Sequence, residues 1–134
     1  MVKITKDFAN ELNAVFARYS VSVENEAEKA ILQSALAVES TAKRLVSRGR
    51  DAESVDGLPP RVDTGLLRAS ITHRMKRIQG KILGEVGTNV SYAPGLEYGT
   101  SQRRWKHPFM GPSIDIEKAG ILLRIAKAVK NATA

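Results

Sequence analysis

Two histidines are the first candidates for catalysis or metal binding, because histidine titrates near neutral pH and is a common metal ligand. His73 lies in a segment where polar and apolar residues alternate, and His107 stands between Lys106 and a proline. Neither has the partner at i+4 that a helical metal site needs, and the chain contains no cysteine. The pattern predicts no metal site and no cofactor, with His73 an ordinary strand residue and His107 a loop residue.

The triplet Asp63-Thr64-Gly65 has the order of the catalytic triplet of aspartic proteases. Leu66-Leu67-Arg68 follows it, however, and a protease of the retroviral type would need a mostly β chain. The better interpretation is a turn in which Asp63 or Thr64 binds local amides and Gly65 redirects the chain. We therefore predict that the chain is not an enzyme and assign no catalytic residue. A small hydrolase using Asp63 or His107 is the weaker alternative.

A basic and aromatic segment, Arg103-Arg104-Trp105-Lys106, is the best candidate for binding a partner. The net charge of +7 resides entirely in residues 63–134, since residues 1–62 contain nine basic and nine acidic residues. Such asymmetry indicates an acidic partner, either nucleic acid or a protein surface. Three interpretations of the segment remain open: a solvated loop with Trp105 packed underneath, a protein contact, or a small basic module that binds nucleic acid.

The first half of the chain has the apolar period of an amphipathic helix. One stripe ends at Tyr19, and a second, rich in alanine, follows it: Phe8, Leu12, Val15, Phe16 and Tyr19, then Ala27, Ala30, Ile31, Ala35, Val38, Ala42, Leu45 and Val46. The segment around residues 20–22 is a poor helix former, so one long helix or two are both possible. Small alanine side chains permit another helix to approach closely.

The second half begins with a long loop and then changes to a period of two. Residues 49–64 predict a mobile loop, because glycine and proline are frequent there and apolar residues are few. Residues 67–76 and 81–88 predict a β-hairpin that turns at Gln79-Gly80, with Arg68, Arg74 and Lys76 on its solvated face. A short helix is expected near residues 92–98, and a final helix from Pro112-Ser113 with the stripe Ile114, Ile121, Leu122, Ile125 and Val129.

These elements predict an α+β fold in which the N-terminal and C-terminal helices pack on a small antiparallel sheet. A length of 134 residues suits one domain over residues 1–134. The chain has no apolar run long enough for a membrane span and no signal-peptide pattern at its N-terminus.

Four short motifs, in order and at matching spacing over about residues 60–115, resemble those of the siphophage tail-completion family, also called tail-to-head joining proteins, minor tail components or neck proteins. The motif residues that match are Asp63, Thr64, Gly65 and Arg68; Gly87, Thr88 and Tyr92; Glu97, Gly99 and Thr100; and Pro108, Phe109 and Pro112. The segment before Pro108 is more basic here than the family pattern.

The resemblance implies a structural virion protein at the head–tail junction, which completes the tail and joins it to the DNA-filled head. It implies a ring of identical subunits around the DNA channel, with DNA passing nearby without specific recognition. The expected partners are other neck and tail proteins, namely a head-completion ring and a tail terminator or tail tube. The protein would remain in the host cytoplasm before assembly. Neither an enzymatic role nor a membrane is implied.

Overall fold

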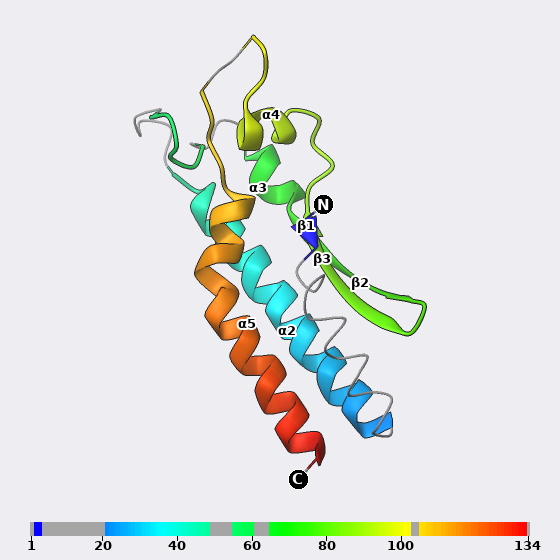
Figure 1. Ribbon diagram of the computed structural model, residues 1–134. Helices are drawn as coiled ribbons and strands as arrows, with labels where there is room; N and C mark the ends of the chain where they lie inside the picture. The colour runs from blue at the N-terminus through cyan, green and yellow to red at the C-terminus, as the bar shows by residue number, and fades with distance from the viewer. Residues whose placement is uncertain (1, 4–20, 49–54, 61–64, 103–104, 134) are drawn as a thin grey trace.

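The computed structural model describes residues 2–3, 21–48, 55–60, 65–102 and 105–133. Two long helices lie side by side and run in opposite directions, with a β-hairpin next to them and two short helices at one end (Figure 1). This arrangement confirms the predicted α+β fold. In chain order the elements are β1 (Val2–Lys3), α2 (Val21–Leu45), α3 (Leu66–Ser70), β2 (Thr72–Ile78), β3 (Lys81–Gly87), α4 (Ala93–Tyr98) and α5 (Met110–Thr133).

Helix α2 buries the predicted alanine-rich stripe. Ile31, Ala35, Val38 and Ala42 are each fully buried, because residues three and four apart share one face of a helix. The predicted first stripe, from Phe8 to Tyr19, and any break before Val21 lie outside the described residues. So does most of the predicted loop at residues 49–64, of which the structure describes residues 55–60.

Helix α5 packs along α2, as the small side chains of α2 allow. A hydrogen bond from Thr41 Oγ1 to Glu117 Oε1, 2.7 Å long, joins the C-terminal part of α2 to the N-terminal part of α5. The predicted stripe of α5 is confirmed at Ile121, which is buried, and at Ile125, which packs against the core. Leu122 was expected in the same stripe but is exposed, because it lies about 100° around the helix from Ile121.

The sheet has three strands in the order β1-β3-β2, and both pairs are antiparallel. The predicted hairpin is confirmed, with Ile78 opposite Lys81 on either side of the turn. The short pairing of β1 with β3 was not predicted. Strand β3 is central and buried along most of its length, including Leu83 and Glu85 on the face that points away from α2. That face is therefore not the freely solvated surface that the alternating pattern predicted.

The hairpin turn contains Gln79 and Gly80, and both have positive φ angles, 50° and 74°. Two such residues in a two-residue loop form a type I′ turn, which suits the right-handed twist of the strands. Glycine adopts this conformation without strain, whereas glutamine does not. Gln79 is thus a strained position in an otherwise regular hairpin.

Replacing Gln79 with asparagine is expected to stabilise the protein by roughly 0.5–1 kcal/mol, since asparagine tolerates the left-handed conformation better than glutamine. Replacing Gln79 with valine is expected to destabilise it, because a β-branched side chain is the least tolerated there. Urea unfolding of the three proteins measures both changes. Equal stability of the asparagine and valine variants would contradict the turn assignment.

One part of the predicted hairpin is wrong. Residues 67–70 were expected to begin the first strand, but Leu66–Ser70 form the helix α3. Leucine, arginine and alanine are strong helix formers, and Gly65, with φ of 80°, turns the chain into this helix. The chain becomes extended at Ile71, which lies between α3 and β2, and Leu67 and Ile71 both reach the core.

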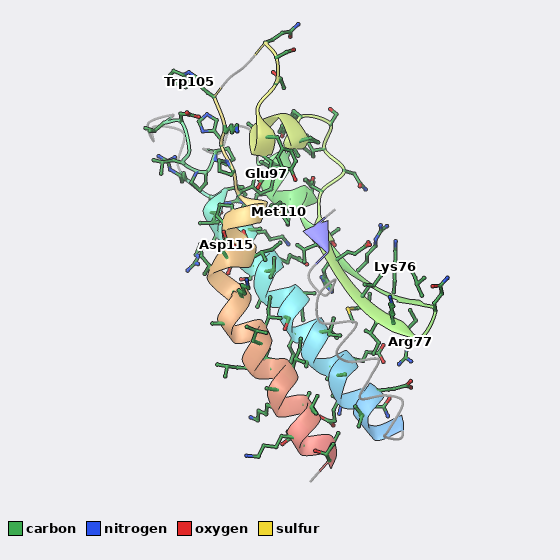
Figure 2. All side chains as sticks on the ribbon, viewed as in Figure 1. Lys76, Arg77, Glu97, Trp105, Met110 and Asp115 are labelled. Atoms are coloured by element: carbon green, nitrogen blue, oxygen red, sulfur yellow. The ribbon has the colours of Figure 1, made fainter. Side chains whose placement is uncertain are left out.

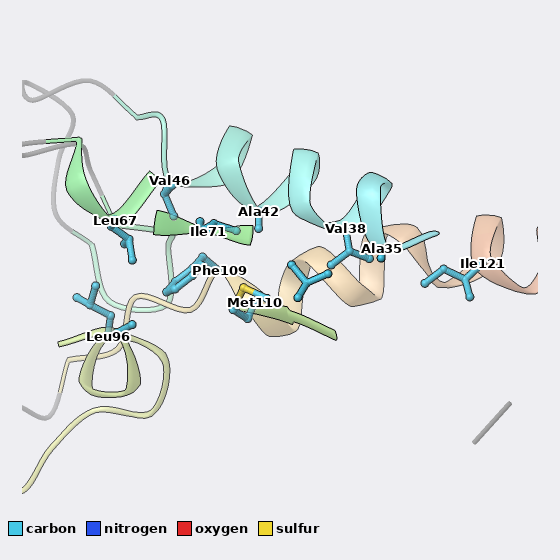
Figure 3. Packing of buried hydrophobic residues seen from close by; sticks show 12 residues of the cluster. Ala35, Val38, Ala42, Val46, Leu67, Ile71, Leu96, Phe109, Met110 and Ile121 are labelled. Carbon is cyan, nitrogen blue, oxygen red and sulfur yellow. The ribbon is translucent and has the colours of Figure 1, made fainter. Parts of the chain in front are cut away.

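The main core lies where α2, α3, α4 and the start of α5 meet. Phe109 is its largest fully buried side chain and sits among Leu67, Ile71, Leu96 and Met110 (Figure 3). Four elements that are distant in sequence are therefore held together around one aromatic ring. The predicted helix at residues 92–98 is confirmed as α4, and Gly99 ends it with φ of 75°.

Candidate functional site

The carboxylate of Glu97, on α4, binds the N-terminus of α5. Its Oε2 accepts hydrogen bonds from the backbone N–H groups of Phe109 and Met110, at 2.9 and 3.1 Å, and its Oε1 accepts one from Gly111 at 2.8 Å. The next residue, Pro112, has no N–H, and Ser113 N–H begins the regular helical bonding to Phe109 O at 3.2 Å. Every donor in the first turn of α5 is thereby satisfied or absent.

This arrangement explains why α5 begins at Met110, two residues before the predicted start at Pro112. Proline suits the first turn of a helix, and a carboxylate is favoured at the positive end of the helix dipole. Gly111 leaves room for the carboxylate, since a Cβ atom there would lie 3.1 Å from Glu97 Oε1. Asp115 and Glu117 lie beyond the first turn of α5.

His107 is buried and holds the chain before α5 in place. Its backbone N–H donates to Leu96 O at 2.6 Å, and its Nδ1 lies 2.9 Å from Leu58 O, as a donor to that carbonyl. The loop position predicted for His107 is confirmed, but its burial was not foreseen. His107 thus links α4, through its backbone N–H, to the segment at residues 55–60, through its imidazole, and has a structural role in this geometry.

Residues of the other motifs support the same end of the molecule. Gly65 precedes α3 and accepts a bond from Ala69 N–H at 3.0 Å, and Arg68 is exposed, with Nη1 3.4 Å from Ser47 Oγ. Thr88 follows β3 and accepts a bond from Val90 N–H at 3.1 Å. Asp63 and Thr64 lie outside the described residues.

A shallow, open depression lies among the second, third and fourth motifs. Its volume is about 130 Å³, and its lining comes from the end of β3, from α4 and from the start of α5: Gly87, Thr88, Ala93, Pro94, Glu97, Tyr98, Phe109 and Met110. The Glu97 carboxylate beside it is occupied by three backbone N–H groups. The described residues of the second, third and fourth motifs thus converge in space and build a joint between helices.

Trp105, one of the partner-contact candidates, lies at this end of the molecule (Figure 2). Trp105 is 58% exposed, so the interpretation that its ring packs underneath the loop is wrong. Lys106 is exposed as well, whereas Arg103 and Arg104 lie outside the described residues. Tyr92 and Tyr98, on the motif side of α4, are also exposed, with Tyr98 at 71%. Large exposed aromatic side chains are typical of protein contact sites.

Three cations of the hairpin, Arg74, Lys76 and Arg77, are paired with carboxylates. Arg74 Nε is bonded to Glu85 Oε2, and Lys76 Nζ lies 3.4 Å from the same oxygen. Arg77 reaches α2, with its guanidinium 2.9 Å from Glu28 Oε2 and 3.5 Å from Glu24 Oε2. Lys76 and Arg77 project from the hairpin in Figure 2.

Ion pairs lower the pKa of two carboxyl groups, those of Glu85 in the hairpin and Glu39 in α2. The hydrogen bond from Arg74 lowers the pKa of Glu85 below its usual value, and this outweighs the effect of burial. Burial acts to raise the pKa of Glu39, but hydrogen bonds from Lys43 and His73 outweigh it, so this pKa is also lowered. Both groups are therefore fully ionised at neutral pH. His73 is a strand residue, as predicted, and pairs with Glu39 of α2.

No cluster of three or more metal-ligating side chains occurs among the residues that the structure describes. Within those same ranges, no helix has the length and hydropathy of a membrane span.

Comparison with known proteins gives one family. The family model of the bacteriophage HK97-gp10-like tail components matches residues 6–99, which include the first two motifs, Glu97 and Gly99. Searches of curated proteins and of solved structures give no significant match.

Proposed function

The chain belongs to the HK97-gp10-like family of bacteriophage tail components, and from this premise we propose that it completes the tail in the phage neck and joins it to the DNA-filled head. A tail component is a structural part of the virion. The joining role, the neck position and the ring described below are the proposal.

The convergence of the motifs at one end of the molecule carries this proposal. Glu97, His107 and Phe109 fix the start of α5 against α4 and the core, and this joint supports the exposed Trp105 and Lys106. A rigid support beneath exposed aromatic and basic side chains suits a contact surface. The side chains of Glu97 and His107 at this end form hydrogen bonds with backbone groups. This use of their polar atoms favours a structural role over catalysis.

We further propose that the assembled protein is a subunit of a ring around the DNA channel. Its neighbours would be a head-completion ring on one side and a tail terminator or tail tube on the other. DNA has to slide through such a channel, so base-specific contacts and strong phosphate binding would hinder its passage. The ion pairs that neutralise Arg74 and Arg77 are consistent with this requirement.

Adding the purified protein to lysates of a phage with an amber mutation in its gene is expected to join filled heads to finished tails. Electron microscopy measures the fraction of joined particles before and after the addition. An unrelated protein of similar size and charge, added at the same concentration, is the control. Normal infectious virions formed without the protein would contradict the joining role.

Nucleic-acid binding is the second candidate function, and the exposed indole of Trp105 beside Lys106 is the observation that favours it. Phosphate binding must weaken steeply as salt rises, because each contact releases counterions. We expect generic double-stranded DNA to show no retardation in gel-shift experiments at physiological salt. Tight binding at low salt that disappears with added salt, and that Trp105→Ala weakens, would favour this alternative.

A further inference from the structure

Two segments about fifty residues apart in the sequence meet at the tip of the molecule. A turn at residues 55–58 closes with the bond from Leu58 N–H to Val55 O at 3.1 Å, and Gly57 provides the positive φ angle of 84° that the turn requires. Gly57 N–H then donates to Lys106 O at 2.8 Å, and Lys106 N–H donates to Asp56 Oδ1 at 2.6 Å. These two bonds fix the turn beside Trp105.

The pairing creates one exposed surface, which we call the tip surface and define as Val55, Leu58, Trp105 and Lys106. The three apolar side chains are each at least 40% exposed. Isolated apolar residues are normal on protein surfaces, but here the backbone bonds bring an exposed indole and two exposed aliphatic residues to one region of the surface. Such a patch is stabilised when a partner covers it.

The backbone beneath this patch is fixed before any partner arrives. His107 follows Lys106 directly and is bonded to both Leu58 O and Leu96 O. Pro60, two residues after Leu58, is buried. Arg48 at the end of α2 adds a bond from its Nη1 to Pro59 O at 2.8 Å. A surface held in this way loses little conformational freedom on binding, which favours affinity.

The charges of the tip surface indicate the chemistry of the partner. One Asp56 oxygen is occupied by the backbone N–H of Lys106, whereas the Lys106 side chain has no ion pair with a described residue. The exposed cation therefore favours a carboxylate on the partner, next to an apolar side chain that covers the indole. The phosphate backbone of a nucleic acid fits less well. The same region of the surface holds two exposed aliphatic side chains, which phosphates do not bind, and the Asp56 carboxylate, which repels them.

We propose that the tip surface docks on a neighbouring virion protein that presents an apolar side chain flanked by carboxylates. This proposal rests on the proposed joining function and identifies the surface and the partner chemistry through which it acts. Val55 and Leu58 become contact residues together with Trp105 and Lys106. The tip surface binds a protein, and DNA is not its ligand.

The test uses the full-length protein and phage particles from the amber mutant. Sedimentation of the protein with purified heads or with purified tails measures binding, and the rate of joining measures function. Trp105→Ala is expected to reduce both by at least roughly tenfold, because buried tryptophans dominate protein interfaces. Lys106→Glu is expected to reduce both and to weaken their dependence on salt, since it removes the attraction to the partner carboxylates.

Matched controls come from α5. Leu123 is 71% exposed and Lys127 is also exposed, so Leu123→Ala truncates an exposed apolar side chain and Lys127→Glu reverses an exposed charge away from the tip surface. Both controls are expected to stay within about twofold of the wild type, as distant surface changes do. Circular dichroism and thermal unfolding verify that all four variants fold.

The outcomes separate the two proposals. If the wild type joins particles and the Trp105 and Lys106 variants do so equally well, the tip surface proposal is overturned and the joining function stands. If the wild type binds particles without joining them, the joining function is overturned. In that case weaker binding of the Trp105 and Lys106 variants supports the tip surface proposal, and equal binding overturns it. If the wild type binds neither heads nor tails, or if Trp105→Ala instead weakens binding to generic DNA, the tip surface proposal is overturned.

Discussion

Replacing Glu97 with alanine is expected to lower the free energy of unfolding by about 3 kcal/mol, because up to three backbone N–H groups lose their acceptor. Each unpaired donor costs about 1–3 kcal/mol when it is buried, and water that enters the site recovers part of this cost. The negative charge at the N-terminus of α5 is lost as well, which removes about 0.3–1 kcal/mol.

Glu97→Gln provides the graded control. The amide keeps one acceptor oxygen but turns an NH₂ group toward donors, so we expect a loss smaller than that of alanine yet clearly measurable. Glu26→Ala removes an exposed carboxylate that lies 3.4 Å from Lys29, and it is expected to cost less than about 0.5 kcal/mol. Urea unfolding gives the stabilities, and hydrogen exchange at Phe109, Met110 and Gly111 should accelerate in the alanine variant. Unchanged stability of Glu97→Ala would disprove the capping role.

Replacing Gly84 with valine is expected to destabilise the protein by more than about 3 kcal/mol, since overpacking by extra carbon atoms costs 1–3 kcal/mol in typical cores. Gly84 lies in β3 and faces α2 at close range. A Cβ atom there would lie 3.0 Å from Ile31 Cγ2 and 3.6 Å from Ala35 Cβ, and valine adds two further carbons. The helix and the sheet would have to separate.

A double-mutant cycle tests the specific contact. Ile31→Ala alone is expected to cost about 2–5 kcal/mol, but the combination with Gly84→Ala should cost less than the sum, because the new methyl group partly fills the space. Gly80→Ala is the control glycine in the same hairpin: a Cβ there meets no atom within 4 Å, so only the positive φ is penalised, at about 1 kcal/mol. Additive costs for Ile31 and Gly84 would contradict the close approach.

Local patterns were sufficient to predict most of the secondary structure. The alanine-rich stripe predicted the buried face of α2, and the alternating pattern with Gln79-Gly80 predicted the hairpin. The same alternation was misleading at residues 67–70, because Leu67 and Ile71 also lie four residues apart, as in a helix. A four-residue period and a two-residue period coincide at that spacing, so the pattern alone could not distinguish them.

The site was less accessible to sequence reasoning. Glu97 was singled out as a motif residue, but its carboxylate acts on amides 12 to 14 residues further along the chain, and only the packing of α4 against α5 brings them together. The contribution of Val55 and Leu58 beside Trp105 depends on backbone bonds between segments about fifty residues apart. The local sequence contained one indication of this helix start, namely Pro112, which suits the first turn of a helix. It contained no indication that Glu97 would accept the bonds of the first N–H groups.

The cap on α5 also has a consequence for the channel proposed above, through which DNA would pass close to the protein. The N-terminus of a helix is a common binding site for phosphate, because free N–H groups and the helix dipole both attract anions. Here Glu97 fills that position, and Pro112 removes the remaining donor. A phosphate group would find no vacant donor and would be repelled by the carboxylate. The N-terminus of α5 would therefore not bind the phosphates of DNA in the proposed channel, and it would not slow the passage of the DNA.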